Sequence, residues 1–272
     1  MEGFSLRGVL LLEVKRVTKT FRRGKHIVNA LAAVDLTVRK GEFLTILGPS
    51  GCGKTTLLHM LGGFEFPTEG SVEIEGRPIT GPGRDRGMVF QEAMLFPWRT
   101  VRANVAWPLQ VAGTPRREAH ARADELLAMV GLSRFGNAYP GELSGGMRQR
   151  AALARTLAME PSVLLMDEPF GALDAQTREV MQEELTRLWQ ASGLTVVFIT
   201  HDINEAIFLG DRVVVMGASP GRVVEDRVIE LERPRSSETK ADPRILEYRS
   251  HLWDVLRRES ARSAPEMAEA GR

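Results

Sequence analysis

Residues 48–55 read Gly-Pro-Ser-Gly-Cys-Gly-Lys-Thr, and this run constrains the fold more than any other part of the chain. It matches the pattern G-x-x-x-x-G-K-[ST], which binds phosphate where a strand leads into a helix. That context is present, because the apolar run Phe43–Leu47 enters the loop and leucines recur at helical spacing over residues 57–61. Glycines let successive backbone N–H groups turn toward an anion without side-chain clashes. The loop therefore predicts a phosphate cradle at a strand–helix junction.

The positions of this cradle have different expected roles. We expect Lys54 to bridge the β- and γ-phosphates of a nucleotide and the Thr55 hydroxyl to ligate Mg²⁺. Cys52 is counted with the nucleotide-binding positions of the cradle, but its side chain has no expected chemistry and is interpreted as small and buried. The alternative, a glycine-rich turn without a ligand, is disfavoured because the lysine, the hydroxyl and the strand–helix context occur together. The remaining residues expected to contact the nucleotide are Gly48, Pro49, Ser50, Gly51, Gly53 and Thr56.

Strand-like and helix-like patterns alternate along the chain, which predicts an α/β domain with a largely parallel sheet. Residues from about 93 to 160 read as helix throughout and are interpreted as an insert. Beyond residue 233 the chain becomes polar, then forms one amphipathic helix around 245–256, and 260–272 are expected to lack regular structure. We therefore expect an ATPase-type domain at 9–233 and a C-terminal extension at 234–272. The strands are expected at 9–21, 43–47, 71–75, 88–90, 163–166, 195–199 and 212–216.

Composition excludes several classes of protein. The formal net charge of +1 gives no global field for nucleic acid, and a single cysteine excludes an internal disulfide framework. No segment approaches the roughly 20 apolar residues that span a bilayer. The apolar residues near the N-terminus are too few for a signal peptide and continue as an alternating strand. The sequence therefore predicts a cytosolic protein.

Polar side chains follow three of the apolar strands. Asp167 and Glu168 come directly after residues 163–166, and Gln91 and His201 follow two other strands. Because ligands lie at the carboxyl ends of parallel strands, we expect these side chains to face the cradle. Asp167 would then hold Mg²⁺ with Gln91, Glu168 would orient the attacking water, and His201 would contact the γ-phosphate or that water. The alternative for each residue taken singly is a polar side chain that merely ends a strand or caps a helix.

A second anion site is predicted where Leu-Ser-Gly-Gly-Met at 143–147 opens a helix. The Ser144 hydroxyl, Gly145, Gly146 and the helix start offer hydrogen-bond donors to a phosphate. A plain kinase or GTPase needs only one such phosphate-binding site, whereas this chain has two, about ninety residues apart.

These elements together resemble the ABC ATPase family over nearly the whole chain. The cradle, Gln91, the 143–147 segment, Met-Asp-Glu-Pro at 166–169, Ala-Leu-Asp at 172–174 and His201 occur in the family's order. The resemblance implies a P-loop NTPase of ABC type, with a mostly parallel sheet, an N-terminal antiparallel β subdomain and an inserted helical subdomain. It also implies two chains meeting head to tail around two ATP molecules, each 143–147 segment closing over the partner's cradle. By the same resemblance Asp174 belongs to the nucleotide site and Phe21 stacks on adenine, although Phe21 could instead be a core residue at a strand end.

Three positions depart from the common family pattern. Met147 stands where glutamine is usual, Gly171 where serine is usual, and Phe21 where tyrosine is frequent. None of these changes removes a catalytic group. Gly171 does put in doubt a hydroxyl contact across the dimer.

A narrower resemblance is to the nitrate, sulfonate and taurine importer branch, through Phe-Pro-Trp at 96–98 and Thr-His-Asp-Ile-Asn-Glu-Ala at 200–206. It implies a peripheral protein at the cytoplasmic face of the membrane, with no nucleic-acid partner. The implied partners are a second ATPase subunit (identical or related), transmembrane permease subunits and, indirectly, a periplasmic or extracellular solute-binding protein. Residues 94–98 would lie near the permease contact, or else form a locally buried loop. The helix at 245–256 either packs on its own domain or makes a dimer or regulatory contact.

Two other functional classes remain open. One is a soluble ABC-type ATPase that acts on nucleic acid, ribosomes or protein assembly. It is disfavoured by the single ATPase domain, the lack of a coiled-coil insertion and the lack of a basic patch. The other is a phosphate-loop kinase or nucleotide-regulated switch, which leaves the 143–147 segment and His201 unexplained.

Overall fold

The computed structural model describes residues 9–24, 26–171, 173–218, 220–236 and 238–270, with backbone only at residue 23 and from 263 onward. It divides the chain into two compact units. Unit one comprises Met1–Pro82 and Thr195–Arg272, and unit two comprises Gly83–Leu194.

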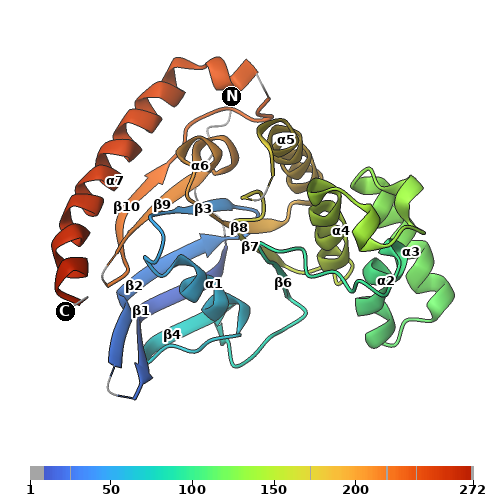
Figure 1. The fold of residues 1–272 in the computed structure, drawn as a ribbon, viewed down its shortest axis with the longest axis horizontal. Helices are drawn as coiled ribbons and strands as arrows, with labels where there is room; N and C mark the ends of the chain where they lie inside the picture. The colour runs from blue at the N-terminus through green and yellow to red at the C-terminus, as the bar shows by residue number, and fades with distance from the viewer. Residues whose placement is uncertain (1–8, 25, 172, 219, 237, 271–272) are drawn as a thin grey trace. The chain divides into compact units, whose positions relative to one another are not determined.

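The centre of unit one is a group of buried strands (Figure 1). β3 (Phe43–Leu47) lies between β8 (Thr195–Thr200) and β9 (Arg212–Gly217) and is parallel to both. Every residue of these three strands is buried, which explains why they read as continuous apolar runs without alternation. β10 (Arg222–Val228) pairs antiparallel with β9.

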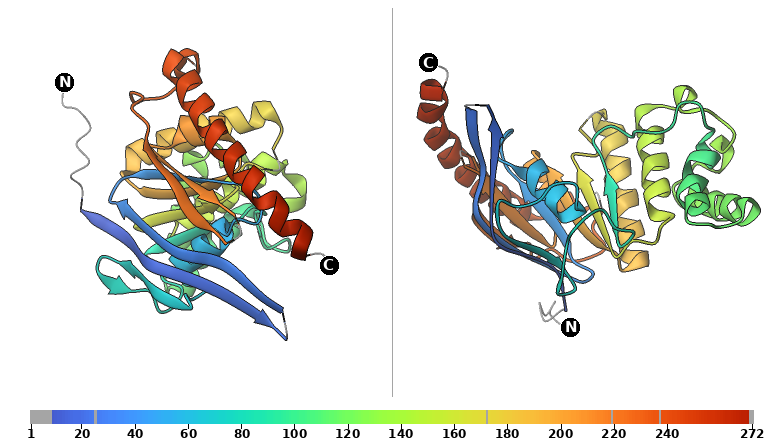
Figure 2. Two further views of the ribbon diagram at one scale, coloured as in Figure 1. Left: turned by 90° about the vertical axis from the view of Figure 1, so that its left-hand side faces the viewer. Right: turned by 90° about the horizontal axis from the view of Figure 1, so that it is seen from below.

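A four-stranded antiparallel sheet with the order β2-β1-β4-β5 forms the other sheet of unit one. The long hairpin of β1 and β2 is prominent in Figure 2. Leu12 and Val14 of β1 are buried in alternation, and Val17 is buried beyond a register irregularity that interrupts this alternation. Helix α1 (Lys54–Gly62) contacts both β4 and β8. The strands of this sheet are β1 (Leu10–Arg23), β2 (His26–Arg39), β4 (Glu69–Ile74) and β5 (Arg77–Pro78).

Unit one ends in α6 (Ile203–Leu209), β9, β10, a short 3₁₀ helix (Glu238–Ala241) and α7 (Pro243–Ala270). α7 packs on α6 and β9, where Leu252 and Val255 join the buried cluster. Arg235 ties the extension to the end of α6, because its guanidinium donates to the carbonyls of Ile207 at 2.8 Å and Gly210 at 2.7 Å. Burial lowers the pKa of Arg235 to about 9. α7 continues well past the helix expected at 245–256, so it takes in residues 260–270, which we expected to lack regular structure.

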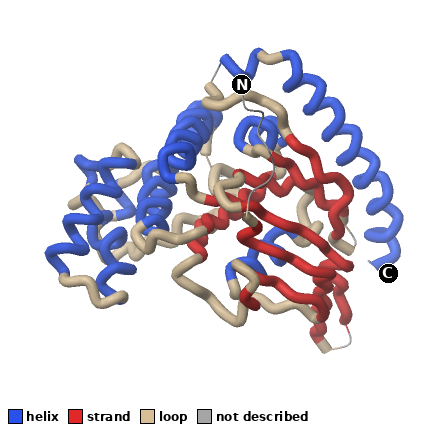
Figure 3. Tube along the Cα trace, turned by 180° about the vertical axis from the view of Figure 1, so that it is seen from behind, coloured by secondary structure: helices blue, strands red, loops and turns tan. Residues whose placement is uncertain are grey.

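The described residues of unit two form two strands, β6 (Arg86–Val89) and β7 (Val163–Asp167), and four α-helices (Figure 3). β6 and β7 pair in parallel. Val105, Leu126, Leu127 and Ala151 belong to the apolar cluster that joins α2, α3 and α4. α4 also contacts β6 and α5. The helices are α2 (Val101–Val111), α3 (Arg116–Met129), α4 (Gly145–Leu157) and α5 (Ala175–Ser192), with 3₁₀ turns at Ser133–Phe135 and Pro140–Glu142.

These elements confirm the predicted α/β fold with parallel strands, an antiparallel sheet near the N-terminus and an inserted group of helices. Three strands were not predicted from the sequence, namely β2, the two-residue β5 and β10. Among the described residues, no helix is both long enough and apolar enough to cross a membrane.

Candidate functional site

The phosphate cradle lies in unit one between β3 and α1, at the strand–helix junction that the sequence predicted. Gly51 and Gly53 have φ angles of 80° and 90°, a left-handed conformation that favours glycine. A Cβ on Gly53 would lie 2.6 Å from Leu31 Cδ2. A Cβ on Gly48 would lie 2.6 Å from the Met216 carbonyl oxygen. The glycines are therefore required by the shape of the loop itself as well as by any ligand.

Lys54 is the first residue of α1 and is almost entirely buried, at 5% exposure. Its Nζ donates to the carbonyls of Gly48 at 2.8 Å and Pro49 at 3.0 Å, so the ammonium group is held against the loop. The first turn of α1 contains no acidic residue to offset the partial positive charge of the helix start. The junction is thus a concentrated positive site in which the lysine and the helix start act together.

The other cradle residues differ in exposure. Cys52 is fully buried, which confirms its interpretation as a small core side chain. Ser50, Gly51 and Thr55 are exposed, whereas Pro49, Gly53 and Thr56 are half-buried and Gly48 is buried. The Thr55 hydroxyl is therefore on an accessible residue.

Gly48→Ala should destabilise the nucleotide-free protein by about 1–3 kcal/mol, because the added methyl would overlap the Met216 carbonyl and Cys52 Sγ, 2.8 Å away. Urea unfolding followed by circular dichroism would measure the change. Gly81→Ala is the matched control, since a Cβ there meets no atom within 4 Å. Its effect should stay within about 0.5 kcal/mol. Equal unfolding midpoints for the two variants would show that Gly48 is not sterically required.

Two further predicted site residues lie in unit one. His201 follows β8 directly and is exposed. Phe21 lies on β1 opposite Val28 and is 39% exposed, with Lys19 Nζ 4.8 Å from its ring centroid. Phe21 is therefore not a core phenylalanine. Its ring is accessible to a planar ligand.

In unit two, the strand register brings Gln91 and the two acids to one edge. Val89 of β6 pairs with Met166 of β7 in parallel register, so the residues that follow both strands leave the same edge. Asp167 is the last residue of β7, and Glu168 follows it. A Cβ on Gly171 would lie 3.6 Å from Gln91 Nε2, so the Gln91 side chain reaches the loop that follows Glu168.

The Glu168 backbone adopts a left-handed conformation, with a φ of 42°. For a residue with a side chain this conformation costs on the order of 1–2 kcal/mol. Such strain is typical of functional sites, where the surrounding structure holds a side chain in a required direction. Its strained backbone therefore distinguishes Glu168 from an ordinary acidic residue at the end of a strand.

Gln149, which no sequence pattern singled out, positions Gln91. Gln149 on α4 is 6% exposed, and its Nε2 donates to the carbonyl of Gln91 at 2.6 Å. α4 begins at the second predicted anion site, so one helix carries Ser144 at its start and fixes the backbone of Gln91 one turn later. A glutamine inside a polar stretch of helix gave no sequence signal for this role.

The 143–147 segment forms the predicted helix start. Ser144 is the exposed N-cap of α4, and its Oγ accepts from the Met147 N–H at 3.3 Å. No acidic residue lies in the first turn. Gly145 is half-buried. Gly146 is buried against Thr177, whose Cγ2 would lie 2.5 Å from a Cβ added at Gly146. Gly146 thus has a packing role, and Ser144 and Gly145 are the accessible members of the segment.

Asp174 is the N-cap of α5. Its carboxylate accepts from the Thr177 N–H at 2.9 Å and from the Thr177 hydroxyl at 2.7 Å. These hydrogen bonds lower the pKa of Asp174 below its ordinary value. The structure gives Asp174 a capping role, and its contact with a nucleotide stays a prediction. Ala172, which precedes it in the quoted motif, lies outside the described residues.

Residues 94–98 form an anchored loop with exposed apolar side chains. Asn104 is fully buried and accepts from the Phe96 N–H at 2.7 Å, and Arg155 donates to the Met94 carbonyl at 2.7 Å. Met94 and Trp98 are nevertheless 59% and 72% exposed. The alternative that this loop is locally buried is therefore wrong.

Comparison with known proteins gives concordant matches. The model of the ABC transporter family matches residues 31–171. A nitrate import ATP-binding protein of Synechocystis sp. is 44% identical over 252 residues, which cover 90% of this chain and 95% of the relative. A taurine import ATP-binding protein of Pseudomonas entomophila is 46% identical over 247 residues, which cover 89% of this chain and 95% of the relative.

A solved structure also matches, namely a dimeric ATP-binding cassette in a post-hydrolysis state bound to ADP and Pi. Its TM-score is 0.73 at 39% sequence identity, and the match covers 81% of this chain and 99% of that chain. The region matched by the family model contains the cradle, Gln91, Ser144 and both acids, which are the residues that the geometry singled out.

Proposed function

This chain belongs to the ABC transporter family of ATPases. We propose that it is the ATP-hydrolysing subunit of an importer for nitrate, taurine, another sulfonate or a similar small solute. The observation that carries this proposal is similarity over nearly the full length of two import ATP-binding proteins. We place the ATPase domain at residues 9–233 and the C-terminal extension at 234–272.

In this proposal two chains close around two ATP molecules. Lys54 and the start of α1 bind the β- and γ-phosphates in one chain, and Ser144 at the start of α4 in the partner contacts the same γ-phosphate. The absence of acidic residues from the first turns of both helices supports this assignment. Only a group that binds the closed state better can shift the equilibrium toward it, and the γ-phosphate meets that condition. Its hydrolysis then reopens the pair.

The residues present suit a magnesium ion as the metal partner of ATP. Thr55, Gln91 and Asp167 offer a hydroxyl, an amide and a carboxylate oxygen, which are the hard ligands that Mg²⁺ prefers. When bound, Mg²⁺ neutralises charge on the phosphate oxygens. Glu168 orients and polarises the attacking water from its strained position, and His201 contacts the γ-phosphate or that water. Phe21 stacks on adenine, with Asp174 near the nucleotide as well.

The proposed partners follow from the exposed surfaces and from the relatives. Met94 and Trp98 give unit two an apolar, aromatic surface that suits a permease subunit. The chain would then be peripheral to the cytoplasmic face of the membrane, with a second ATPase subunit beside it. A solute-binding protein on the opposite face would act through the permease.

Uptake by the intact transporter tests this function. The chain, isolated with its permease and reconstituted in vesicles, should drive uptake of labelled taurine or nitrate only when ATP is present on its side. Lys54→Ala should abolish uptake while the complex still assembles, because the variant removes the ammonium group that binds phosphate. ATP-independent uptake, or isolation of the chain with RNA and without a permease, would refute the proposal.

A further inference from the structure

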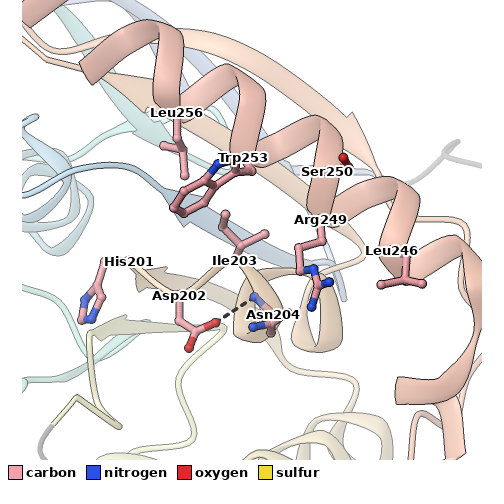
Figure 4. A pocket seen from close by; sticks show the side chains of 9 residues that line it. All are labelled: His201, Asp202, Ile203, Asn204, Leu246, Arg249, Ser250, Trp253 and Leu256. Carbon is pink, nitrogen blue, oxygen red and sulfur yellow. Dashed lines mark hydrogen bonds between the residues drawn. The ribbon is translucent and has the colours of Figure 1, made fainter. Parts of the chain in front are cut away.

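A pocket of about 720 Å³ lies within unit one, between α7 and the turn from β8 to α6 (Figure 4). Residues 246–256 of α7 form one wall, and residues 201–204 form the other. The volume is within the range of roughly 300–1,000 Å³ typical of small-molecule sites. None of the nucleotide-binding roles assigned above uses the α7 wall.

α7 has two distinct apolar faces. Leu252 and Val255 are 0% and 7% exposed and pack into the core of unit one, and the ion pair of Arg222 with Glu259 at 2.6 Å holds the helix further along. The other face carries Leu246 and Trp253, which are 58% and 61% exposed and line the pocket. Because the first face already anchors the helix, the second is held in place without being needed for folding.

The polar groups of the pocket differ in their hydrogen bonding. The Asp202 carboxylate accepts from the backbone N–H groups of Asn204 at 2.8 Å and Glu205 at 3.2 Å. Arg249, by contrast, has no hydrogen bond or ion pair with any described residue. Figure 4 shows Arg249 and Trp253 both projecting from α7 toward the β8–α6 turn. The pocket thus combines an exposed guanidinium, which no described residue pairs with, and a broad apolar surface.

We propose that this pocket binds a small organic anion, with its carboxylate or sulfonate on Arg249 and its apolar body against Trp253, and that occupancy slows ATP hydrolysis. The planar guanidinium matches the geometry of an oxyanion, and the indole offers a large face to a planar or aliphatic body. Ile203 and Leu256 complete the apolar surface. The effect on hydrolysis rests on the function proposed above for His201, which lines the same pocket.

Binding is tested first on the full, nucleotide-free chain, so that the result does not depend on ATPase activity. Calorimetry with naphthalene sulfonate as the probe should give one site per chain. Arg249→Ala and Trp253→Ala should each weaken binding about tenfold. Arg257→Ala on the same helix and Trp98→Ala in unit two are matched controls that should bind as the unchanged chain does. Naphthol, the uncharged analogue, should bind the unchanged chain about as weakly as the sulfonate binds Arg249→Ala.

ATP turnover is tested second. Saturating naphthalene sulfonate should lower turnover of the unchanged chain, and Arg249→Ala should keep its basal turnover but lose the inhibition. Binding that neither pocket variant weakens overturns the site. Binding without any change in turnover overturns the coupling to His201 and leaves the proposed ATPase function intact. Absence of binding, together with a lower oligomeric state for Trp253→Ala in light scattering, would assign this face to a second copy of the chain and overturn the proposal.

Discussion

Glu168→Gln is expected to bind ATP about as well as the unchanged chain while losing turnover by on the order of 10²–10⁴-fold. The amide keeps the size of the side chain but can no longer accept a proton from, or polarise, the attacking water. Because hydrolysis is what reopens the closed pair in the proposed cycle, the variant should also accumulate as a dimer with ATP. Phosphate release measures turnover, and light scattering with and without ATP measures the dimer.

Glu160→Gln is a suitable control for this experiment. Glu160 also has a positive φ, of 50°, but it is exposed and pairs with Arg122 at 3.1 Å away from the strand edge. Loss of an exposed ion pair costs at most about 1 kcal/mol, so this variant should hydrolyse ATP normally. Normal turnover by Glu168→Gln would remove the role given to Glu168.

Ser144→Glu should abolish ATP-dependent dimer formation while leaving ATP binding by the isolated chain intact. A negative charge suits the start of α4, so the helix should persist, but the charge opposes the partner's γ-phosphate. Juxtaposed like charges cost several kcal/mol, so turnover should fall by about 100-fold or more. Fluorescent nucleotide titration, light scattering and phosphate release report the three quantities separately.

Ser133→Glu makes the same change at another exposed serine of unit two and should leave all three quantities unchanged. If Ser144→Glu formed dimers and hydrolysed ATP as the unchanged chain does, the contact between Ser144 and the partner's nucleotide would be refuted. A crystal with a non-hydrolysable triphosphate would show directly whether Ser144 and Gly145 lie near any nucleotide.

The parts of the site that the sequence predicted are those encoded by contiguous residues. The cradle at 48–55 and the acids after β7 could be located because a buried strand, a glycine-rich turn and a helix follow one another without interruption. Completely buried strands such as β3 stand out as apolar runs bounded by polar residues. At these positions the apolar runs in the sequence coincide with the residues that the fold buries.

The parts that were missed depend on distant contacts or on partial burial. β10 has no buried residue, and β2 begins with four exposed residues, so neither shows the alternation of a half-buried strand. Gln149 acquires its role only because folding brings it to Gln91, 58 positions earlier. The pocket beside α7 is formed by two segments more than forty positions apart. One of them is the helix that we expected either to pack on its own domain or to make a dimer or regulatory contact. No local periodicity could reveal any of these features.

The close approach of α4 and α5 has a mechanical consequence. Gly146 leaves room for the Thr177 methyl group and nothing larger, and Thr177 is hydrogen-bonded through both its backbone and its hydroxyl to Asp174. The two helix starts must therefore shift together. A ligand that pulls on Ser144 would in this way displace Asp174 and the start of α5 as well.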